Sequence, residues 1–229
     1  MTQVRRDPYD FSQRPPCYYS RLRSNMAEYI PVGAQTILDI GCAEGYFGKY
    51  LKETRSVEVW GVEIDEKAAL IARDHIDNVL LGDVTLLLND IPDQYFDCIV
   101  FNDVLEHLVN PYKVLTEIKN KLTPHGMLVC SIPNVRYLPV LKELMIKKQW
   151  EYADNGVLDK SHLRFFTLKS IQKMFHELQF DIISIEGINS IKCIYHLIAN
   201  VLTCGMLSDT RYMQYVCSVK PRKIYEQCE

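Results

Sequence analysis

The stretch ILDIGCAEGYFGKYL, residues 37–51, decides the fold we expect for this chain. Its apolar start predicts a buried strand that ends near Asp39, and Gly41 and Gly45 bracket the short loop that follows. Glycine adopts positive φ without steric cost and lets a ligand approach the backbone closely. Phe47 and Leu51 then have the apolar spacing of a helix. A strand, a glycine loop and a helix in this order are typical of a nucleotide-type site.

Strand-like runs alternate with helix-like runs on both sides of this stretch. Beyond residues 36–40, apolar strand-like runs occupy residues 57–62, 78–81, 97–102 and 126–133. Between them, residues 46–54, 66–76 and 111–122 repeat apolar side chains at helical spacing. This alternation predicts an α/β fold of the Rossmann-like, doubly wound kind. We expect a mostly parallel seven-stranded sheet with helices on both faces.

The last third of the chain has a different pattern. Thr167 is expected to cap a helix in TLKSIQKMFHEL. Two strands are expected at residues 180–188 and 211–220, one of them antiparallel, with a helical stretch near 190–204 between them. Residues 134–166 form a long insertion after the fifth strand, where such folds keep substrate sites. Because no linker interrupts the sequence, we expect one domain over residues 1–229.

Composition and charge narrow the classes of function. The chain has 229 residues, 48% of them hydrophobic, which is enough for a sizeable core. A formal net charge of −3 predicts no nucleic-acid partner, because such proteins carry a basic patch. No apolar run reaches about 18 residues, so we expect neither a membrane span nor a secretory signal.

The cysteines and histidines give no strong sign of a metal. The eight cysteines form no CxxC pair, which indicates reduced thiols in a cytoplasmic protein. Asp159 and His162 are three positions apart, and two ligands without a further cluster are too few for a site. We therefore expect no metal.

Polar side chains follow successive strands of the predicted sheet. Glu63 ends the second strand, where an acidic group accepts hydrogen bonds from ribose hydroxyls. Asp83 follows the third strand, in position to take the amino group of an adenine. The segment FNDVLEHL, residues 101–108, follows the fourth strand. Since carboxyl ends of parallel strands share one edge of the sheet, these groups are expected around one crevice.

The motifs LDIGCAEGYFG, GVEID, GDV, FDCIVFNDVLEHL and LTPHGMLVCSIPN together resemble the class I S-adenosylmethionine-dependent methyltransferases, over residues 18 to 190. The resemblance implies S-adenosyl-L-methionine as cofactor and S-adenosyl-L-homocysteine as product. It implies cofactor contacts from Asp39, Gly41, Cys42, Gly45, Glu63, Ile64, Asp83, Val84, Asn102 and Val104. It also implies that residues 1–33 cover the cofactor, with Tyr19 or Arg23 reaching its methionine carboxylate. An arginine guanidinium suits a carboxylate because it can donate two parallel hydrogen bonds. Packing of this segment on the sheet edge is the alternative.

A second resemblance concerns the acceptor. SIPNVRYLPVL and WEYADNGVLDKSHLRFFT look like a subgroup associated with polysaccharide and glycoconjugate assembly, which implies a sugar-like or small polar acceptor. The acceptor contacts expected from this stretch are Asn134, Arg136, Tyr137, Trp150, Asp159 and Arg164. The expected partners are thus a small-molecule or glycan acceptor and, as one form of assembly, a second copy in a homodimer.

Methyl transfer to a hydroxyl needs a base, and His162 or His107 is the candidate, oriented by Asp159 or Glu106. Structural roles for both histidines remain open, including a fold-stabilising network of Asp159, His162 and Arg164. Among functions, a phenolic or quinone-like acceptor and a non-catalytic cofactor-binding module are the alternatives. A Rossmann dehydrogenase is disfavoured, because its fingerprint requires glycine where Ala43 stands.

Overall fold

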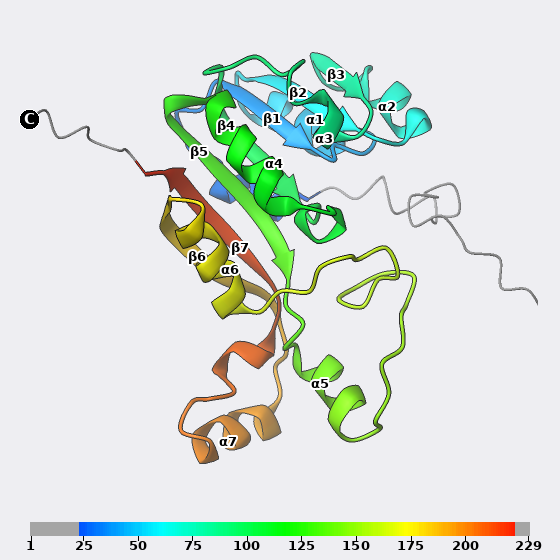
Figure 1. Ribbon diagram of the computed structural model, residues 1–229, viewed down its shortest axis with the longest axis vertical. Helices are drawn as coiled ribbons and strands as arrows, with labels where there is room; N and C mark the ends of the chain where they lie inside the picture. Colours follow the sequence, from blue (N-terminus) through cyan, green and yellow to red (C-terminus); the bar gives the residue numbers. More distant parts are fainter. Residues whose placement is uncertain (1–22, 223–229) are drawn as a thin grey trace, which may run out of the picture.

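The computed structural model describes residues 23–222, apart from the side chains of residues 195 and 199. One seven-stranded sheet runs through it in the order β3-β2-β1-β4-β5-β7-β6 (Figure 1). Its strands are β1 (Thr36–Ile40), β2 (Glu58–Glu63), β3 (Asn78–Leu81), β4 (Phe96–Asn102), β5 (Leu122–Pro133), β6 (Phe180–Ser190) and β7 (Tyr212–Pro221). Strands β1 to β5 pair in parallel, and β7 is antiparallel to both β5 and β6. The predicted doubly wound sheet with an antiparallel strand near the C-terminus is confirmed.

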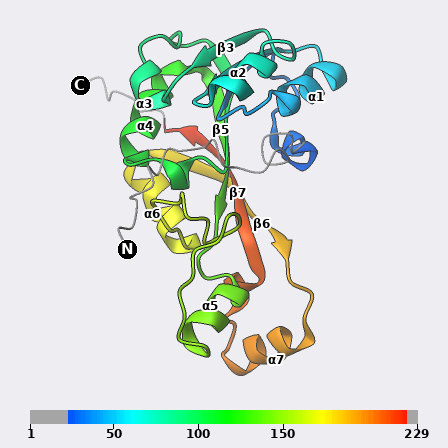
Figure 2. The ribbon, with the colours of Figure 1, turned by 90° about the vertical axis from the view of Figure 1, so that its right-hand side faces the viewer.

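Helices cover both faces of the sheet (Figure 2). One face packs against η3 (Ser24–Tyr29), α1 (Tyr46–Thr54) and α2 (Glu66–Ala72). The other face packs against α3 (Val84–Leu87), α4 (Pro111–Ile118) and α6 (Leu168–Glu177). Neighbouring residues of one strand serve opposite layers: in β1, Ile37 packs into the first and Leu38 into the second. This two-sided burial explains the near-continuous apolar strands. Each buried apolar side chain contributes about 1.5–3 kcal/mol to the stability of the fold.

Short elements join these layers, and they agree with the predicted signals in one place and differ in another. Thr167 caps α6 through a capping box with Ser170, as expected. Two 3-10 turns, η4 (Leu105–His107) and η5 (Lys119–Lys121), flank α4. The helix expected over residues 111–122 ends earlier, at Ile118, because the chain tightens into η5 before it enters β5.

The insertion and the β6–β7 connection lie together beyond the carboxyl end of β5 (Figures 1 and 2). The insertion contains α5 (Leu138–Met145), and the connection contains α7 (Ile194–Leu202) and η6 (Ser208–Arg211). Arg136 and Asp209 form an ion pair between the two segments, with Nε and Oδ2 at 2.6 Å. No helix within residues 23–222 has the length and apolar character needed to cross a bilayer.

Candidate active site

The glycine loop after β1 has the backbone that its sequence predicts. Gly41 has φ of 73° and Gly45 has φ of 77°, both in the left-handed region that favours glycine. A Cβ at Gly41 would lie 2.6 Å from the Cγ2 atom of Val104, which follows β4. The loop therefore packs against the β4 connection so closely that only glycine fits.

Glu63 holds this loop in place from the end of β2. Its Oε2 atom accepts a hydrogen bond from the Ala43 amide at 2.8 Å, and its Oε1 atom accepts from the Ile64 and Asp65 amides, both at 2.9 Å. Ala43 has φ of 50°, a strained value for alanine, and this conformation directs its N–H at Glu63. Burial raises the pKa of Glu63, although the three backbone donors partly oppose that effect.

Two buried oxygens at the centre of the sheet lack partners. Oδ1 of Asp39 in β1 and Oδ1 of Asn102 in β4 accept no hydrogen bond from any described residue. Burial, followed by the charge of Glu63, raises the pKa of Asp39 to about 7, while Arg23 acts in the opposite direction. Buried polar groups are rarely left unpaired, so these two atoms indicate a place where a polar ligand binds.

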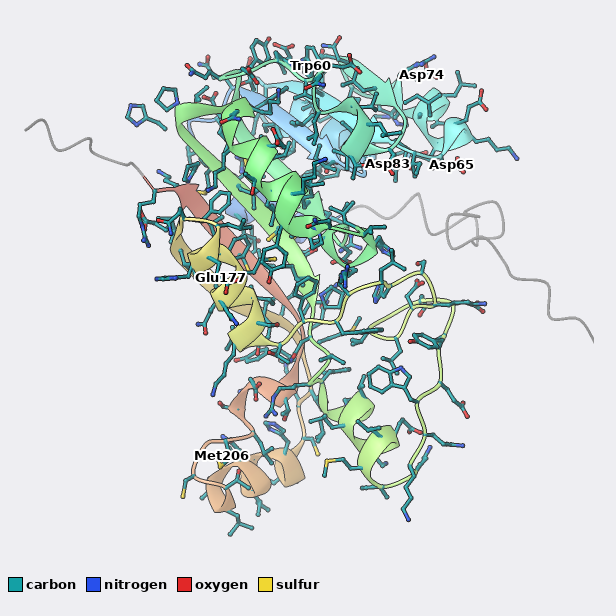
Figure 3. All side chains as sticks on the ribbon, viewed as in Figure 1. Trp60, Asp65, Asp74, Asp83, Glu177 and Met206 are labelled. Carbon is teal, nitrogen blue, oxygen red and sulfur yellow. The ribbon has the colours of Figure 1, made fainter. Side chains whose placement is uncertain are left out.

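The outer end of the crevice combines carboxylates with apolar surface. Asp83 caps α3 by accepting hydrogen bonds from the Thr85 amide and hydroxyl, both at 2.8 Å. Asp65 and Asp83 follow adjacent strands and lie at the same edge of the sheet (Figure 3). Ile64, the neighbour of Asp65 in the chain, is 39% exposed, whereas Val84, the neighbour of Asp83, is buried. An exposed apolar side chain beside carboxylates suits the flat face and the amino group of an adenine.

Cys42 lies within the loop itself. Its side chain is buried, and burial, followed by the charges of Asp39 and Glu63, raises the pKa of the thiol well above its ordinary value. The thiol therefore stays protonated, and Cys42 contributes shape rather than a nucleophile. Together the orphaned oxygens, the close-packed glycine loop and Glu63 fit the cofactor that the sequence predicts.

The N-terminal segment reaches this crevice through Arg23. Its guanidinium forms an ion pair with Asp103 at 2.5 Å, and Asp103 also accepts hydrogen bonds from Gln214 and Ser131. Asp103, Ser131 and Gln214 are absent from the predicted site. Tyr19, the other predicted contact from this segment, lies outside the described residues.

The segment GVLDKSHLRFFT returns to the carboxyl edge of β4. The amides of Leu163 and Arg164 donate to the Glu106 carbonyl at 2.8 and 3.0 Å. Arg164 also donates through its guanidinium to the Val109 carbonyl. Phe166 is buried and pairs with Asn134 at the end of β5. The segment therefore lies against η4, which follows β4 directly.

Both predicted bases meet at this contact. The imidazole rings of His107 and His162 lie 4.8 Å apart, and His162 Nε2 lies 3.8 Å from Glu106 Oε1. Asp159 instead accepts hydrogen bonds from the Ser161 amide and hydroxyl. Of the two carboxylates expected to orient a histidine, Glu106 is the one beside the ring.

Glu106 is the most deeply buried carboxylate of the site. Its side chain is 1% exposed, and neither carboxylate oxygen has a hydrogen-bond partner among the described residues. Burial, followed by the charge of Asp103, raises its pKa well above the ordinary value. A carboxyl group in this position is costly to the fold, which points to a functional reason for it.

The predicted acceptor contacts divide into two groups. Asn134 is fully buried, donates to the Asp209 and Tyr212 carbonyls, and accepts from the Arg136 amide. This differs from the predicted acceptor contact for Asn134 and Arg136, because their polar groups tie the insertion to η6. Trp150 remains at the surface, with its ring 5.5 Å from Phe165, and Tyr137 is half-buried at the start of α5.

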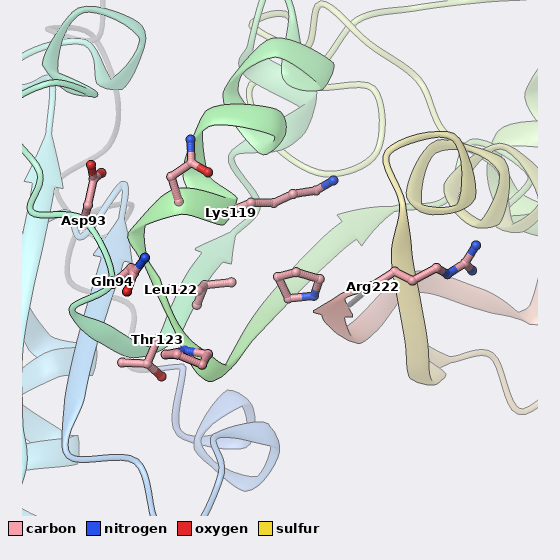
Figure 4. Close-up of a pocket in the computed structure, with 9 residues that line it drawn as sticks. Asp93, Gln94, Lys119, Leu122, Thr123 and Arg222 are labelled. Carbon is pink, nitrogen blue, oxygen red and sulfur yellow. The ribbon is translucent and has the colours of Figure 1, made fainter. Parts of the chain in front are cut away.

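A cavity of about 430 Å³ lies elsewhere, at the opposite edge of the sheet (Figure 4). Gln94, Leu122 and Arg222 are among the residues that line it. They stand at the amino ends of β4 and β5 and at the end of the antiparallel β7, and the cavity contains none of the predicted site residues. Ligands of such sheets bind at the carboxyl ends of the strands, so this cavity is not the active site.

The family is shown by comparison with known proteins. Residues 11–185 match a family model described as a methyltransferase domain. This chain belongs to the methyltransferase domain family. At the level of the family, the predicted enzyme class and the predicted cofactor, S-adenosylmethionine, are confirmed.

Individual relatives match this chain over less than half of its length. The chain is 32% identical over 107 residues to a ubiquinone biosynthesis O-methyltransferase of Glaesserella parasuis, an alignment covering 43% of this chain and 45% of the relative. It is 33% identical over 114 residues to a ribosomal protein L11 methyltransferase of Burkholderia mallei, covering 49% of this chain and 36% of the relative. The chain thus spans less than half of the length of these relatives.

Solved structures show the same fold. A methyltransferase from Archaeoglobus fulgidus has a TM-score of 0.64 at 22% identity, over 88% of this chain and 92% of that one. The [4+2]-cyclase SpnF has a TM-score of 0.62 at 16% identity, over 87% of this chain and 80% of that one. Since the second is named for a different reaction, the fold alone does not fix the chemistry.

Proposed function

We propose that this chain binds S-adenosylmethionine in the crevice at the ends of β1, β2 and β4 and transfers its methyl group to a hydroxyl of a small acceptor. The pair of unpartnered buried oxygens on Asp39 and Asn102 carries the proposal. They lie beside a glycine loop held by Glu63, where a ligand with its own donors would satisfy them.

The chain's own residues bind and orient. Glu63 has two oxygens with further lone pairs for ribose hydroxyls, and Asp83 provides a carboxylate for the adenine amino group. Asp39 is suited to the positively charged methionine end, and Arg23 lies near enough to affect the pKa of Asp39. When bound, the cofactor supplies a methyl group attached to a positively charged sulfur, and the sulfur leaves as a neutral thioether. Alignment of the acceptor is then the main task of the protein.

The acceptor side is formed by the insertion. Trp150, Tyr152 and Phe165 gather aromatic rings there, with centroids of 5.5 and 6.4 Å to Phe165. Phe165 lies 6.4 Å from the His162 ring, so the aromatic surface adjoins the histidine pair. Aromatic surface next to a few polar groups is typical of small-molecule sites. We propose a sugar or glycoconjugate hydroxyl as the acceptor, activated at the cluster of Glu106, His107 and His162.

A phenolic or quinone-like acceptor is the second candidate. The same aromatic surface favours it, and one relative is named as an O-methyltransferase of ubiquinone biosynthesis. The two candidates differ in how they use the rings: a flat phenol needs them to bind, whereas a sugar also needs hydrogen bonds.

The test is methyl transfer from labelled cofactor to a panel of nucleotide sugars, glycan fragments and catechols. We expect label in a methyl ether of one sugar class, and calorimetry should give one cofactor site per chain. Label in the catechols alone would select the second candidate. Cofactor binding without transfer to any acceptor would support a non-catalytic module, and no cofactor binding would refute the proposal.

A further inference from the structure

Three side chains at the floor of the acceptor side bring ligand-type atoms together. Glu106 contributes a carboxylate oxygen, and His107 and His162 each contribute a ring nitrogen, all within 4.8 Å of one another. We propose that this triad binds one divalent transition-metal ion. The ligands come from two segments, η4 and the insertion, which are joined by hydrogen bonds to the Glu106 carbonyl.

The two imidazoles are oriented as metal ligands are. Nδ1 of His107 lies 3.1 Å from the Ser161 carbonyl oxygen, and Nδ1 of His162 lies 3.0 Å from the Val157 carbonyl oxygen. A carbonyl oxygen only accepts, so each Nδ1 carries the proton and each Nε2 carries the lone pair of the neutral ring. Metal-ligating histidines are held by such a second hydrogen bond, which fixes both tautomer and ring direction.

Glu106 supplies an independent observation. Its carboxylate is 1% exposed, and neither oxygen has a hydrogen-bond partner within residues 23–222. A buried carboxylate that accepts no hydrogen bond carries a large desolvation cost, which a bound cation would offset. Two ligands each about 2.1 Å from one ion lie on the order of 3–3.5 Å apart. The separation of 3.8 Å between Glu106 Oε1 and His162 Nε2 therefore closes with a small side-chain rotation.

The ligand types indicate the class of ion. Two imidazoles and one carboxylate favour zinc, cobalt, nickel, iron or manganese. Magnesium and calcium take oxygen ligands almost exclusively, so they fit less well. A closed structural zinc site uses four protein ligands, whereas three leave at least one position open.

The open position suggests a role. It would suit the hydroxyl oxygen of an acceptor, and a divalent cation raises the acidity of such a hydroxyl, whose proton passes to water. This role rests on the function proposed above, but binding of the ion does not. The expectation of no metal from the sequence considered Asp159 with His162; the structure turns Asp159 toward Ser161 and brings in Glu106 and His107 instead.

The test uses cobalt(II) with the full chain after treatment with a chelator. We expect calorimetry to give one ion per chain and the visible spectrum to show ligand-field bands, without the charge-transfer band of a cobalt thiolate. Glu106→Gln keeps the shape of the side chain and removes its charge, and it should weaken cobalt binding roughly 100-fold or more. His125→Asn removes an exposed histidine and should leave binding unchanged.

Several outcomes would overturn the proposal: no stoichiometric binding by the wild type, a thiolate band, or equal affinity in Glu106→Gln. Circular dichroism checks that each variant is folded, and His162→Asn provides a second ligand variant. Calorimetry with S-adenosylmethionine on the metal-free protein separates the two proposals. Cofactor binding with methyl transfer but no cobalt site would leave the proposed function intact and refute the ion. Cobalt binding without any methyl transfer would leave the ion site intact and refute the proposed function.

Discussion

Replacing Asp39 by asparagine tests the electrostatics of the cofactor crevice. Burial and the neighbouring Glu63 raise the pKa of Asp39 to about 7 from an ordinary value of 3.8. In that interval the folded chain retains a proton that the unfolded chain has lost. Stability from this group is therefore complete below pH 3.8 and is lost as the pH rises to about 7.

The magnitude follows from the interval. Each pH unit contributes about 1.4 kcal/mol, so the loss reaches about 1.5 kcal/mol at pH 5 and about 4 kcal/mol at pH 8. Asparagine cannot ionise, so Asp39→Asn should avoid this loss. Its amide adds hydrogen-bonding needs of its own, but their cost does not vary with pH. The slope of the difference between the two proteins is thus the decisive quantity.

Urea unfolding of both proteins between pH 5 and pH 8.5 measures this slope. The free energy of unfolding of Asp39→Asn should rise relative to wild type up to about pH 7 and then stay level. Asp97→Asn is the matched control, because the pKa of Asp97 is lowered from 3.8, so the group is ionised in both the folded and the unfolded chain across this range and the difference from wild type should stay level. Burial alone would raise the pKa of Asp97, but hydrogen bonds from the Gln35 and Thr36 amides and the Thr36 hydroxyl lower it. Parallel curves for wild type and Asp39→Asn would refute the reasoning.

Three further changes test the loop and the insertion. Glu63→Gln should lower the free energy of unfolding by about 1–3 kcal/mol and weaken cofactor binding, since the single amide oxygen cannot accept from the Ala43, Ile64 and Asp65 N–H groups as the two carboxylate oxygens do; the half-buried Glu58→Gln at the far end of β2 should leave binding unchanged by calorimetry. Gly41→Ala should abolish cofactor binding, because its Cβ would meet Val104 at 2.6 Å in a left-handed backbone, and a normal dissociation constant would contradict that. Asn134→Ala should lower the free energy of unfolding by about 1–3 kcal/mol, because the Asp209 and Tyr212 carbonyls lose their hydrogen bonds, while the folded protein should keep its cofactor affinity.

The sheet was predictable because its signals are local. Apolar runs, glycine turns and helical spacing each occupy a few consecutive residues, and parallel strands buried on both faces leave little ambiguity. The same holds for the glycine loop, because its two glycines follow directly on the first strand. The ends of helices were less predictable: the helix expected to Leu122 stops at Ile118, where a tighter turn competes with α-helical spacing.

The polar partners of the site were not predictable in this way. Asp103 and Gln214 are 111 positions apart, and the side chains of His107 and His162 come from different segments. No periodicity connects such positions, so the sequence left Asp159 and Glu106 both open as the carboxylate beside a histidine, and only the packed structure places Glu106 next to His162. Asn134 and Arg136 were predicted as acceptor contacts for the same reason, because the sequence does not show that their polar groups bind residues at and beside η6.

The unpaired groups of the crevice have a consequence for the whole protein. Asp39, Asn102 and Glu106 each leave buried oxygens without hydrogen bonds among the described residues, and each such group lowers the stability of the ligand-free chain. Ligands that satisfy these oxygens bind the folded state alone, so they raise the free energy of unfolding by about 2.7 kcal/mol at a concentration of 100 times Kd. Because the proposed function assigns Asp39 and Asn102 to the cofactor and Glu106 to the acceptor side, the two kinds of ligand should stabilise the chain separately. A cofactor that left the melting temperature unchanged at saturation would show that the orphaned oxygens are not its binding site.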